Sequence, residues 1–455
     1  MTMKRRDALK TIGGLAGAAT LAKVLPACGG GSDRPKGITT VVYMMMENRS
    51  YDHLFGARKM IEGLAGNGLT QGTTLLDVND QPVGLWEPNL DQECDLDPPH
   101  GWDALRASFN GGRCDGFVKT HQMEHENPTA IEPMQYLTRT QVPVSYALAD
   151  AYTSCDNWFC SVMGPTWPNR FYWHAGTSFG EMVNALPTSL SPSIYHRLVA
   201  KNVDWGYYYG NIPVVGVIND FDVTPFIHHF SDFLDDAARG TLPPVVYIDP
   251  GFNANDDHPP VHPINGQALI AAVYKALATS PQWPNCQLLI TYDENGGFYD
   301  HVPPPLAPDD MAAIGFNQLG FRVPTMVIGP YAKQSYVSSV QFDHTSALKH
   351  IQNTFGLDRL TMRTDAATDI DDCVDQERLE ANDPSDPIDL PAIDLSQWPM
   401  SSACTSGDFK EAHPVIAWAD ANRERLGSLD LRGTERDMLT MIDNYLGSKP
   451  RAKVR

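Results

Sequence analysis

Four stretches of this chain are hydrophobic over their whole length, and they restrict the fold more than any other feature. They comprise residues 38–46, 244–248, 286–292 and 323–328. A strand with one face in water alternates apolar and polar residues, whereas parallel strands buried on both faces are apolar throughout. Helical patterns at 266–278 and 344–355 follow two of these runs. The alternation predicts one α/β domain over residues 38–447, a three-layer sandwich with a mostly parallel central sheet.

Three of the four runs end in polar side chains. Glu47 and Asn48 follow the first run, Asp249 the second, and Asp293 and Glu294 the third. Ligands of parallel α/β sheets bind outside the carboxyl ends of the strands, so these groups are expected to converge at one edge. Oxygen ligands of this kind suit Ca²⁺, Mg²⁺ or Mn²⁺, or zinc in an oxygen-rich site. Either pair alone is weak evidence, because carboxylates at strand ends often cap a neighbouring helix.

The segment 163–170, with the sequence MGPTWPNR, offers a candidate nucleophile. Pro168 favours a first helical turn, which would place Thr166 at a helix N-terminus. Free N–H groups and the helix dipole at that position favour a phosphate and a deprotonated hydroxyl. A metal ligated by that oxygen would lower its pKa further. Taken alone, however, the segment favours an ordinary N-cap role for Thr166.

Several histidines and tryptophans are candidates for the rest of the chemistry. One histidine by itself is more often a structural hydrogen bonder, but a set on converging segments favours general acid catalysis. Tryptophan faces can hold a quaternary ammonium head group, although buried core tryptophans are commoner. The candidates are His100, His228, His229, His258, His301 and His344, together with Trp102, Trp167 and Trp173.

The formal charge of −21 at pH 7 argues against two classes of partner. Nucleic acids are bound by basic surfaces, and so are anionic membranes. Most of this acidity is expected to serve solubility. Locally clustered carboxylates can also be neutralised by a bound cation.

Residues 1–27 are predicted to be an export signal. The sequence KRRDALK at 4–10 resembles a twin-arginine motif, and the apolar run that follows is too short and mild to span a membrane. Cys28 stands at what resembles a lipoprotein processing site and opens a flexible linker, 28–37. We therefore expect export by the twin-arginine machinery to the periplasm, cell surface or medium, with membrane contact through a lipid anchor at Cys28. Residues 448–455 form a basic tail.

The remaining seven cysteines suit an oxidising compartment, where local disulfides form. Their connectivity stays open at this point, because spacing alone does not determine it. The local candidates are Cys94 with Cys114, Cys155 with Cys160, and Cys373 with Cys404, and Cys286 is left over in a predicted buried strand. The chain has no cysteine spacing typical of a thiolate zinc site.

Five blocks of the sequence resemble the bacterial and plant phosphoesterase family, which contains the non-specific phospholipases C and related acid phosphatases. They are residues 47–53, 164–170, 292–302, 320–324 and 342–346. The resemblance covers most of residues 38–357 and implies an alkaline-phosphatase-like α/β fold with one divalent metal ion. The family's metal ligands correspond to Glu47, Asn48, Thr166, Asp293 and Glu294, and its active-site histidines to His100, His258, His228 and His229. Asn295 stands where relatives usually have histidine.

The resemblance implies a phosphoric ester hydrolase that acts on a phospholipid or a small phosphate ester. Within the family a threonine nucleophile resembles the phospholipases C and a serine the phosphatases, so Thr166 favours a phospholipase C that acts through a phosphothreonine intermediate. An acid phosphatase acting on phosphomonoesters is the alternative. A metal- or phosphate-binding lipoprotein without catalysis is less favoured, because a candidate nucleophile and candidate acids are present. A sulfatase or phosphonate hydrolase is a weaker rival, since no sulfatase motif is visible.

Overall fold

The computed structural model describes residues 37–90, 96–186, 190–218, 220–393, 413–427 and 435–447. The predicted export signal, Cys28 and the basic tail lie outside these residues. No helix among the described residues is long and apolar enough to cross a membrane.

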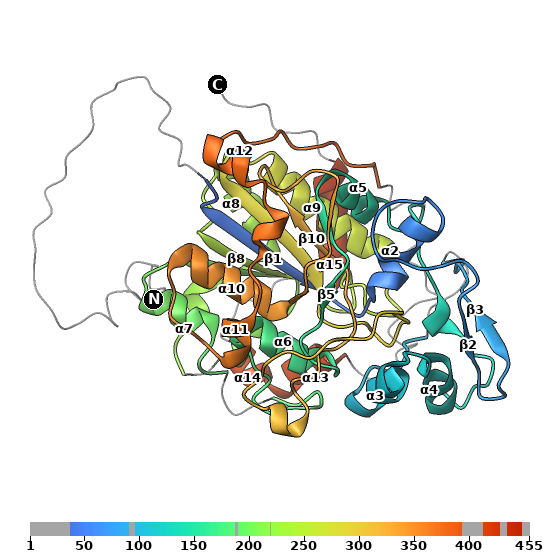
Figure 1. Ribbon diagram of the computed structural model, residues 1–455. Coiled ribbons are helices and arrows are strands. Elements are labelled where there is room, and N and C mark those ends of the chain that lie inside the picture. The colour runs from blue at the N-terminus through green and yellow to red at the C-terminus, as the bar shows by residue number, and fades with distance from the viewer. Residues whose placement is uncertain are drawn as a thin grey trace, which may run out of the picture.

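An eight-stranded sheet forms the centre of the molecule, with the strand order β11-β4-β10-β9-β1-β8-β6-β7 (Figure 1). Each of the four continuous apolar runs contains one of its strands. These are β1 (Thr40–Met46), β8 (Val245–Asp249), β9 (Cys286–Tyr292) and β10 (Thr325–Ile328), and every residue in them is buried. The outer strands are β4 (Thr153–Cys155), β6 (Trp205–Tyr209), β7 (Ile227–His229) and β11 (Tyr336–Ser338).

The predicted mostly parallel sheet is confirmed, with one exception among the four runs. β1 pairs in parallel with both β8 and β9, and β6 continues the parallel arrangement on the far side of β8. β10, however, runs antiparallel to β9 and β4. Its unbroken apolar sequence reflects burial on both faces, which any central strand shares whatever its direction.

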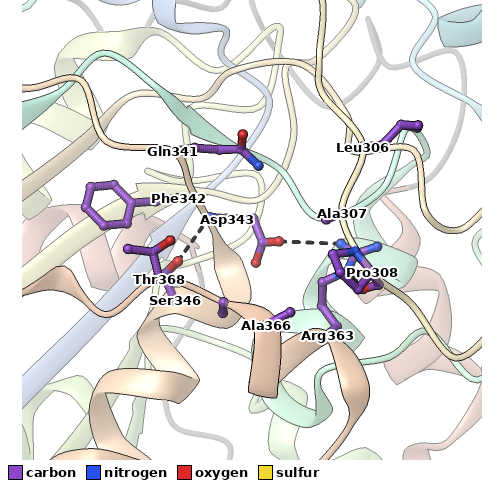
Figure 2. Close-up of a pocket in the computed structure, with 11 residues that line it drawn as sticks. Leu306, Ala307, Pro308, Gln341, Phe342, Asp343, Ser346, Arg363, Ala366 and Thr368 are labelled. Atoms are coloured by element: carbon purple, nitrogen blue, oxygen red, sulfur yellow. Dashed lines mark hydrogen bonds and ion pairs between the residues drawn. The ribbon is translucent and has the colours of Figure 1, made fainter.

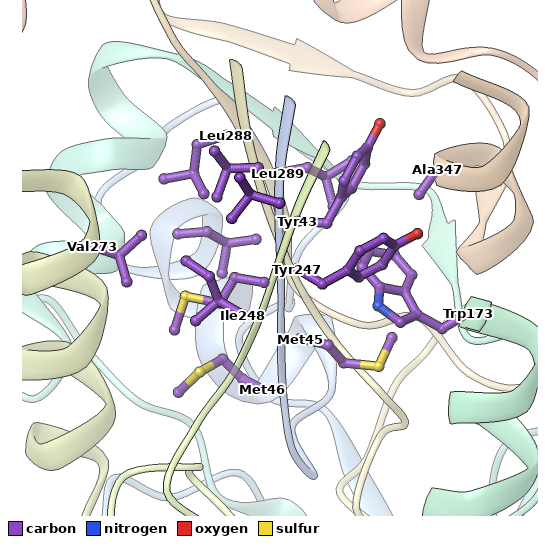
Figure 3. Packing of buried hydrophobic residues seen from close by; sticks show 14 of the residues in the cluster. Tyr43, Met45, Met46, Trp173, Tyr247, Ile248, Val273, Leu288, Leu289 and Ala347 are labelled. Atoms are coloured by element: carbon purple, nitrogen blue, oxygen red, sulfur yellow. The ribbon is translucent and has the colours of Figure 1, made fainter. Parts of the chain in front are cut away.

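Helices cover both faces of the sheet and confirm the three-layer sandwich. Figure 3 shows Val273 of α9 (Pro263–Ala278) on one face, and Trp173 of α6 (Thr166–Ala175) and Ala347 of α10 (His344–Phe355) on the other. The ring of Tyr43, from β1, meets the Trp173 ring edge-on at 5.8 Å and stacks on Tyr247. The α9 face also carries α5 (Pro143–Ala151), α8 (Phe230–Arg239) and α15 (Glu435–Gly447).

The helix boundaries follow local capping chemistry. α10 begins after Asp343, whose side chain accepts the Thr345 N–H in a capping box, and it ends at Gly356 in the left-handed conformation. α9 begins with Pro263 in its first turn, three residues before the predicted start. The C-terminal part of the described chain forms α13 (Pro414–Ala421), α14 (Arg423–Leu426) and α15.

The segment 60–135, which contains none of the four apolar runs, forms several short strands and helices. The hairpin of β2 (Thr74–Leu76) and β3 (Pro82–Gly84) is followed by α3 (Trp102–Phe109) and α4 (Phe117–Glu124). These elements pack in a small apolar cluster that also includes Met163, Tyr299 and Phe321. Their short segments give no long periodic signal in the sequence. The remaining elements are α2 (Tyr51–Met60), β5 (Trp158–Phe159), α7 (Ile194–Ala200), β12 (Phe342–Asp343), α11 (Met362–Ala366) and α12 (Gln376–Ala381).

The predicted pairing of Cys155 with Cys160 is wrong. Both thiols are free and buried. The Cys155 sulfur instead lies 3.8 Å from the sulfur of Cys373, and the Cys160 thiol donates to the carbonyl of Val162. Proximity in sequence misled the prediction because Cys155 ends β4 while Cys160 follows β5. Cys286 is free and buried in β9, as expected. Cys94 and Cys404 lie outside the described residues.

Candidate active site

The carboxyl ends of β1 and β9 bring two predicted ligand pairs together. The two strands are adjacent and in register at Met46 and Tyr292, so the residues that follow them lie side by side. The Asn48 N–H donates to Asp293 Oδ1 at 3.1 Å. Glu47, Asn48, Asp293 and Glu294 are all fully buried. The pairing register of β1 and β9 therefore brings these four carboxylate or amide side chains together at one buried site.

The helix that begins with Thr166 is bonded to the same strand ends. Thr166 is the first residue of α6, and Arg170 lies four residues later on the same face. The guanidinium of Arg170 donates twice to Glu47 Oε1, at 2.7 and 3.0 Å, and its Nε lies 3.8 Å from Asp293 Oδ2. Arg170 also donates to Asp249, at the end of β8. Arg170 thus ties the start of α6 to three strand ends.

The residues predicted to bind a metal have the oxygen atoms that a cation requires. Four of the five predicted ligands each have one buried oxygen without a hydrogen-bond partner: Asn48 Oδ1, Thr166 Oγ1, Asp293 Oδ2 and Glu294 Oε1. An unpartnered buried polar atom costs about 1–3 kcal/mol, so four on neighbouring segments call for a common partner. All four are hard oxygen donors, which suit a divalent cation.

The electrostatics of Asp293 and Glu294 also favour a cation. Burial raises the pKa of both carboxyls well above the usual range. The negative charge of Glu47 raises the Asp293 pKa further, and Asp293 does the same to Glu294. A positive ion among these oxygens would reverse both effects.

Glu47 is bonded differently from the other four predicted ligands. Its Oε1 accepts both hydrogen bonds from Arg170, and its Oε2 lies 2.7 Å from His413 Nε2 and 3.3 Å from His258 Nδ1. Burial alone would raise the Glu47 pKa, but His413, Arg170 and His258 hold it well below the usual range. Glu47 is therefore an anion in this site, and Oε2 is the oxygen that Arg170 leaves to other partners.

Close backbone packing explains the glycines that follow Glu294. Gly296 has φ of +60°, and a Cβ atom there would lie 2.3 Å from the carbonyl oxygen of Asn48. A larger residue would push the β9 loop away from the end of β1. Asn295, where the family resemblance suggests histidine, donates to the carbonyl of Phe298 and thereby closes this turn.

The start of α6 differs from the expected anion site. The N-cap is Pro165, so Thr166 is not the cap and its hydroxyl is not used for capping. The Trp167 N–H donates to Asn184, and Pro168 has no N–H. Two of the first three residues of α6 therefore offer no free backbone N–H to an anion. The Thr166 hydroxyl is a more suitable group for contacting a ligand than the helix N-terminus is. Asn169 holds the preceding loop by donating to the carbonyls of Val162, Gly164 and Pro165.

His258 lies between two carboxylates. Its Nε2 is 3.2 Å from Asp97 Oδ2, and its Nδ1 is 3.3 Å from Glu47 Oε2. Burial alone would lower its pKa, but Asp97 and Glu47 outweigh burial and raise the pKa well above 6.5. His258 therefore carries a proton on each nitrogen at neutral pH, which is the state of a general acid.

His100 faces the same carboxylates from the loop before α3. Its Nδ1 lies 2.7 Å from the carbonyl of Pro98, so this nitrogen carries a proton. Its Nε2 is then directed toward Asn48 Nδ2 at 3.5 Å and Glu294 Oε1 at 3.6 Å. The His100 side chain is 13% exposed and that of Asp97 39%. This loop is the side from which a substrate can approach the otherwise buried carboxylates.

The other predicted histidines occupy different positions. His228 and His229 lie on β7, the outermost strand and three places from β1. The His228 ring packs on Tyr208, and His229 caps α8 by accepting the Ser231 N–H. His344 lies 2.7 Å from the Asp293 carbonyl, and burial lowers its pKa to about 4, so neutral His344 supports the β9 end as a hydrogen-bond donor.

The suggested aromatic faces for a choline group are taken by protein contacts. Trp167 and Trp173 are almost fully buried. Trp102 is partly exposed, but the guanidinium of Arg106 lies 3.2 Å from its ring centroid and Phe316 packs at 5.1 Å. These three tryptophans therefore do not form an aromatic cage.

Sequence reasoning missed three residues of the site: Asp97, Arg170 and His413. Arg170 had a usable signal, because it ends the block that carries Thr166. Asp97 is three residues before His100, a spacing that is common by chance. His413 gave no signal, since it lies far from every motif and reaches Glu47 only through the fold.

A small pocket lies elsewhere, beneath the loop before α10 (Figure 2). Its volume is about 70 Å³, and its lining includes Asp343, Ser346 and Arg363. These groups are bonded to one another: Arg363 Nη1 lies 3.4 Å from Asp343 Oδ2, and the Asp343 N–H donates to Ser346. The pocket is therefore a packing gap with satisfied polar groups rather than a second chemical site.

A second polar cluster supports the ends of the site loops. Three groups of side chains lie close enough together to hold a metal ion. They are Glu47 with His258 and His413, Asp97 with His100 and His258, and this second cluster, Asp52 with Asp300 and His301. In the Asp52 cluster, however, Arg322 already donates to both carboxylates, and His301 Nδ1 lies 2.6 Å from Asp52 Oδ2. This cluster is a neutralised ion-pair network that joins α2 to the loop after β9.

His301 gives the network a pH dependence. Burial lowers its pKa, but Asp52 and Asp300 outweigh burial and raise it above the ordinary 6.5. The protonated ring therefore stabilises the fold fully below pH 6.5, and this contribution is lost as pH rises through the higher folded pKa. We expect His301→Gln to lower the free energy of unfolding by on the order of 1 kcal/mol at pH 6 and by less at pH 9. Urea unfolding at both values measures this, and an equal loss at both would contradict it.

Comparison with known proteins gives a consistent result. The model of the phosphoesterase family matches residues 38–358. Non-specific phospholipase C6 of Arabidopsis thaliana is 32% identical over 379 residues, 74% of this chain and 72% of that protein. Phospholipase C B of Mycobacterium tuberculosis is 32% identical over 391 residues, 70% of this chain and 74% of that protein. Among solved structures, an alkaline phosphatase superfamily protein from Vibrio parahaemolyticus has a TM-score of 0.37 at 9% identity, over 73% of this chain and 69% of that one.

Proposed function

This chain belongs to the phosphoesterase family and is a phosphoric ester hydrolase, and on that premise we propose that it is an exported phospholipase C. It would cleave glycerophospholipids to diacylglycerol and a phosphorylated head group through a phosphothreonine intermediate. The observation that carries this proposal is the unpaired, fully buried hydroxyl of Thr166, one helical turn before Arg170, which bonds Glu47 and approaches Asp293. A buried hydroxyl without a hydrogen bond is costly for folding, and catalysis accounts for it.

The first step is an attack by Thr166 Oγ1 on phosphorus. The bond from phosphorus to the glycerol oxygen breaks, and His258, which holds two protons between Glu47 and Asp97, protonates the departing diacylglycerol. We assign the Thr166 proton to His100 Nε2, which faces the site with its lone pair. In the second step water attacks phosphorus and gives a proton to His258. The bond from phosphorus to Thr166 Oγ1 breaks, Thr166 takes its proton back from His100, and the phosphorylated head group is released.

The residues of the site fit one divalent metal ion. Asn48, Thr166, Asp293 and Glu294 would hold it through their unpaired oxygens, with Glu47 Oε2 as the remaining donor. When bound, such an ion lowers the pKa of a ligating hydroxyl and stabilises negative charge on phosphoryl oxygens. Arg170 and the backbone at Gly296 keep the ligand-bearing segments together whether or not an ion is bound.

Two features support a phospholipid substrate over a phosphomonoester. The candidate nucleophile is threonine, which resembles the phospholipases within the family, and the relatives named above are themselves called phospholipases C. The export part of the proposal rests on residues 1–27, and the lipid anchor on Cys28.

One comparison tests both the substrate and the metal. Purified protein is given phosphatidylcholine vesicles or p-nitrophenyl phosphate, with and without EDTA, and release of diacylglycerol or of nitrophenol is measured. We expect diacylglycerol release that falls at least roughly tenfold with EDTA and returns when a divalent ion is added back. Hydrolysis of the monoester alone would favour the acid phosphatase alternative. Activity that EDTA leaves unchanged on both substrates would count against the metal.

A further inference from the structure

A C-terminal segment reaches into the active site from outside the matched family region. His413 lies 55 residues beyond residue 358, where the family match ends, and immediately before α13. Its side chain is fully buried, and its Nε2 is 2.7 Å from Oε2 of Glu47. His413 therefore links the C-terminal helices to the first strand of the sheet.

The backbone of α13 fixes the tautomer of His413. The Val415 N–H donates to His413 Nδ1 at 3.2 Å, so Nδ1 provides a lone pair and the proton must be on Nε2. The Nε2–H then points at Glu47 Oε2. A neutral imidazole in this state cannot bind a metal through Nε2, so the group Glu47, His258 and His413 is not a second metal site.

Packing around His413 holds the ring in this orientation. Phe252 lies 5.1 Å from the His413 ring centroid and the His258 ring 4.9 Å. The neighbouring Pro414 carbonyl accepts the indole N–H of Trp167, and Trp418 meets the Trp167 ring edge-on. The start of α13 is therefore seated on the residue next to Thr166.

We propose that His413 is a positioning residue, whose Nε2–H holds Glu47 Oε2 in the orientation that the metal and His258 require. Oε2 is the one Glu47 oxygen that Arg170 leaves available, and without His413 the carboxylate could turn about its last bond. Hydrogen bonds from such supporting residues orient ligating carboxylates and contribute to metal affinity. The inference rests on the proposed function, because it assigns Glu47 to the metal site.

Two substitutions separate the two hydrogen bonds of His413. His413→Gln places an amide N–H near the position of Nε2 and loses the acceptor for Val415. His413→Asn places an amide oxygen near the position of Nδ1, keeps the cap and cannot reach Glu47 as a donor. His262→Gln is the matched control, because His262 also precedes a proline and caps its helix through the N–H two residues later.

The measurement is the dissociation constant for Mn²⁺, Ca²⁺ and Zn²⁺, each titrated by calorimetry into metal-free full-length protein. We expect His413→Asn to weaken binding roughly 10- to 100-fold and to lower kcat more than it raises KM, while His413→Gln stays within a few-fold of wild type. Thermal unfolding of His413→Gln and His262→Gln reports the loss of a cap alone. If His413→Asn does not fold, His413→Ser keeps the cap and replaces it in the comparison.

The outcomes decide the proposal. Unchanged metal affinity in His413→Asn, equal weakening in both variants, or stronger weakening in His413→Gln would each overturn it, and so would a wild-type chain that binds none of the three ions. A wild-type chain that binds metal but hydrolyses neither test substrate would refute the proposed function. The metal affinities of the two His413 variants would still test the positioning role of His413 in that case.

Discussion

Replacing Thr166 with alanine is expected to reduce turnover by roughly 10³-fold or more, because it removes the protein atom proposed to bond covalently to phosphorus. The fold should be retained, since Thr166 Oγ1 makes no hydrogen bond that would be lost. The measurement is the initial rate of diacylglycerol release from phosphatidylcholine, with the circular dichroism spectrum as the check on folding. Retention of a tenth of the wild-type rate would remove Thr166 from the nucleophile role.

Two further substitutions at Thr166 sharpen the test. Valine keeps the branched shape and removes only the oxygen, so Thr166→Val should be as inactive as the alanine variant. In metal-free protein it should also be more stable than wild type, by about 1–3 kcal/mol, since a buried unpaired hydroxyl is eliminated. Serine keeps the hydroxyl, and Thr166→Ser should retain activity within about tenfold. An active valine variant or a destabilised one would contradict the assignment.

Replacing Arg170 with methionine is expected to cause the largest loss of stability, about 3–5 kcal/mol. Arg170 is fully buried between Glu47 and Asp249, which are themselves buried, and its removal leaves two carboxylates without their cation. Since folded domains are stable by only about 5–15 kcal/mol, such a loss is a large part of the whole. The midpoint and slope of urea unfolding in the presence of EDTA measure it.

Arg139 provides the matched control for Arg170. It also bridges two carboxylates, Glu62 and Asp150, with contacts as short as those of Arg170. Its side chain is 43% exposed, however, so water and salt screen the charges. Arg139→Met should therefore cost less than about 1 kcal/mol. Equal losses for the two variants would show that burial does not set the contribution of Arg170.

The strands were predictable because burial on both faces leaves a direct trace in the sequence. β1, β8, β9 and β10 all coincide with continuous apolar runs. The antiparallel direction of β10 was not predictable in the same way, since a buried strand has the same composition in either direction. The strands and helices between residues 60 and 135 are too short for their apolar residues to show a clear periodic pattern.

The ligand pairs at the ends of β1 and β9 were predictable for a related reason. A polar pair directly after a buried strand marks the carboxyl edge of the sheet. Because β1 and β9 are adjacent and in register, their two polar pairs lie side by side. The role of Thr166 was not decided by its local sequence, which favoured an N-cap. The structure shows Pro165 in that place and leaves the Thr166 hydroxyl unpaired.

The sequence by itself determined the layered fold and the two oxygen-bearing strand ends, because both depend on residue type and order within a few positions. Only the tertiary structure decided which groups surround Glu47. Arg170, His258 and His413 come from positions 123, 211 and 366 residues further along the chain. Local sequence does not predict these long-range contacts, which depend on the packing of distant segments, including α6 and α13, against the sheet. For the same reason the structure, and not the spacing of cysteines, separated Cys155 from Cys160 and placed it beside Cys373.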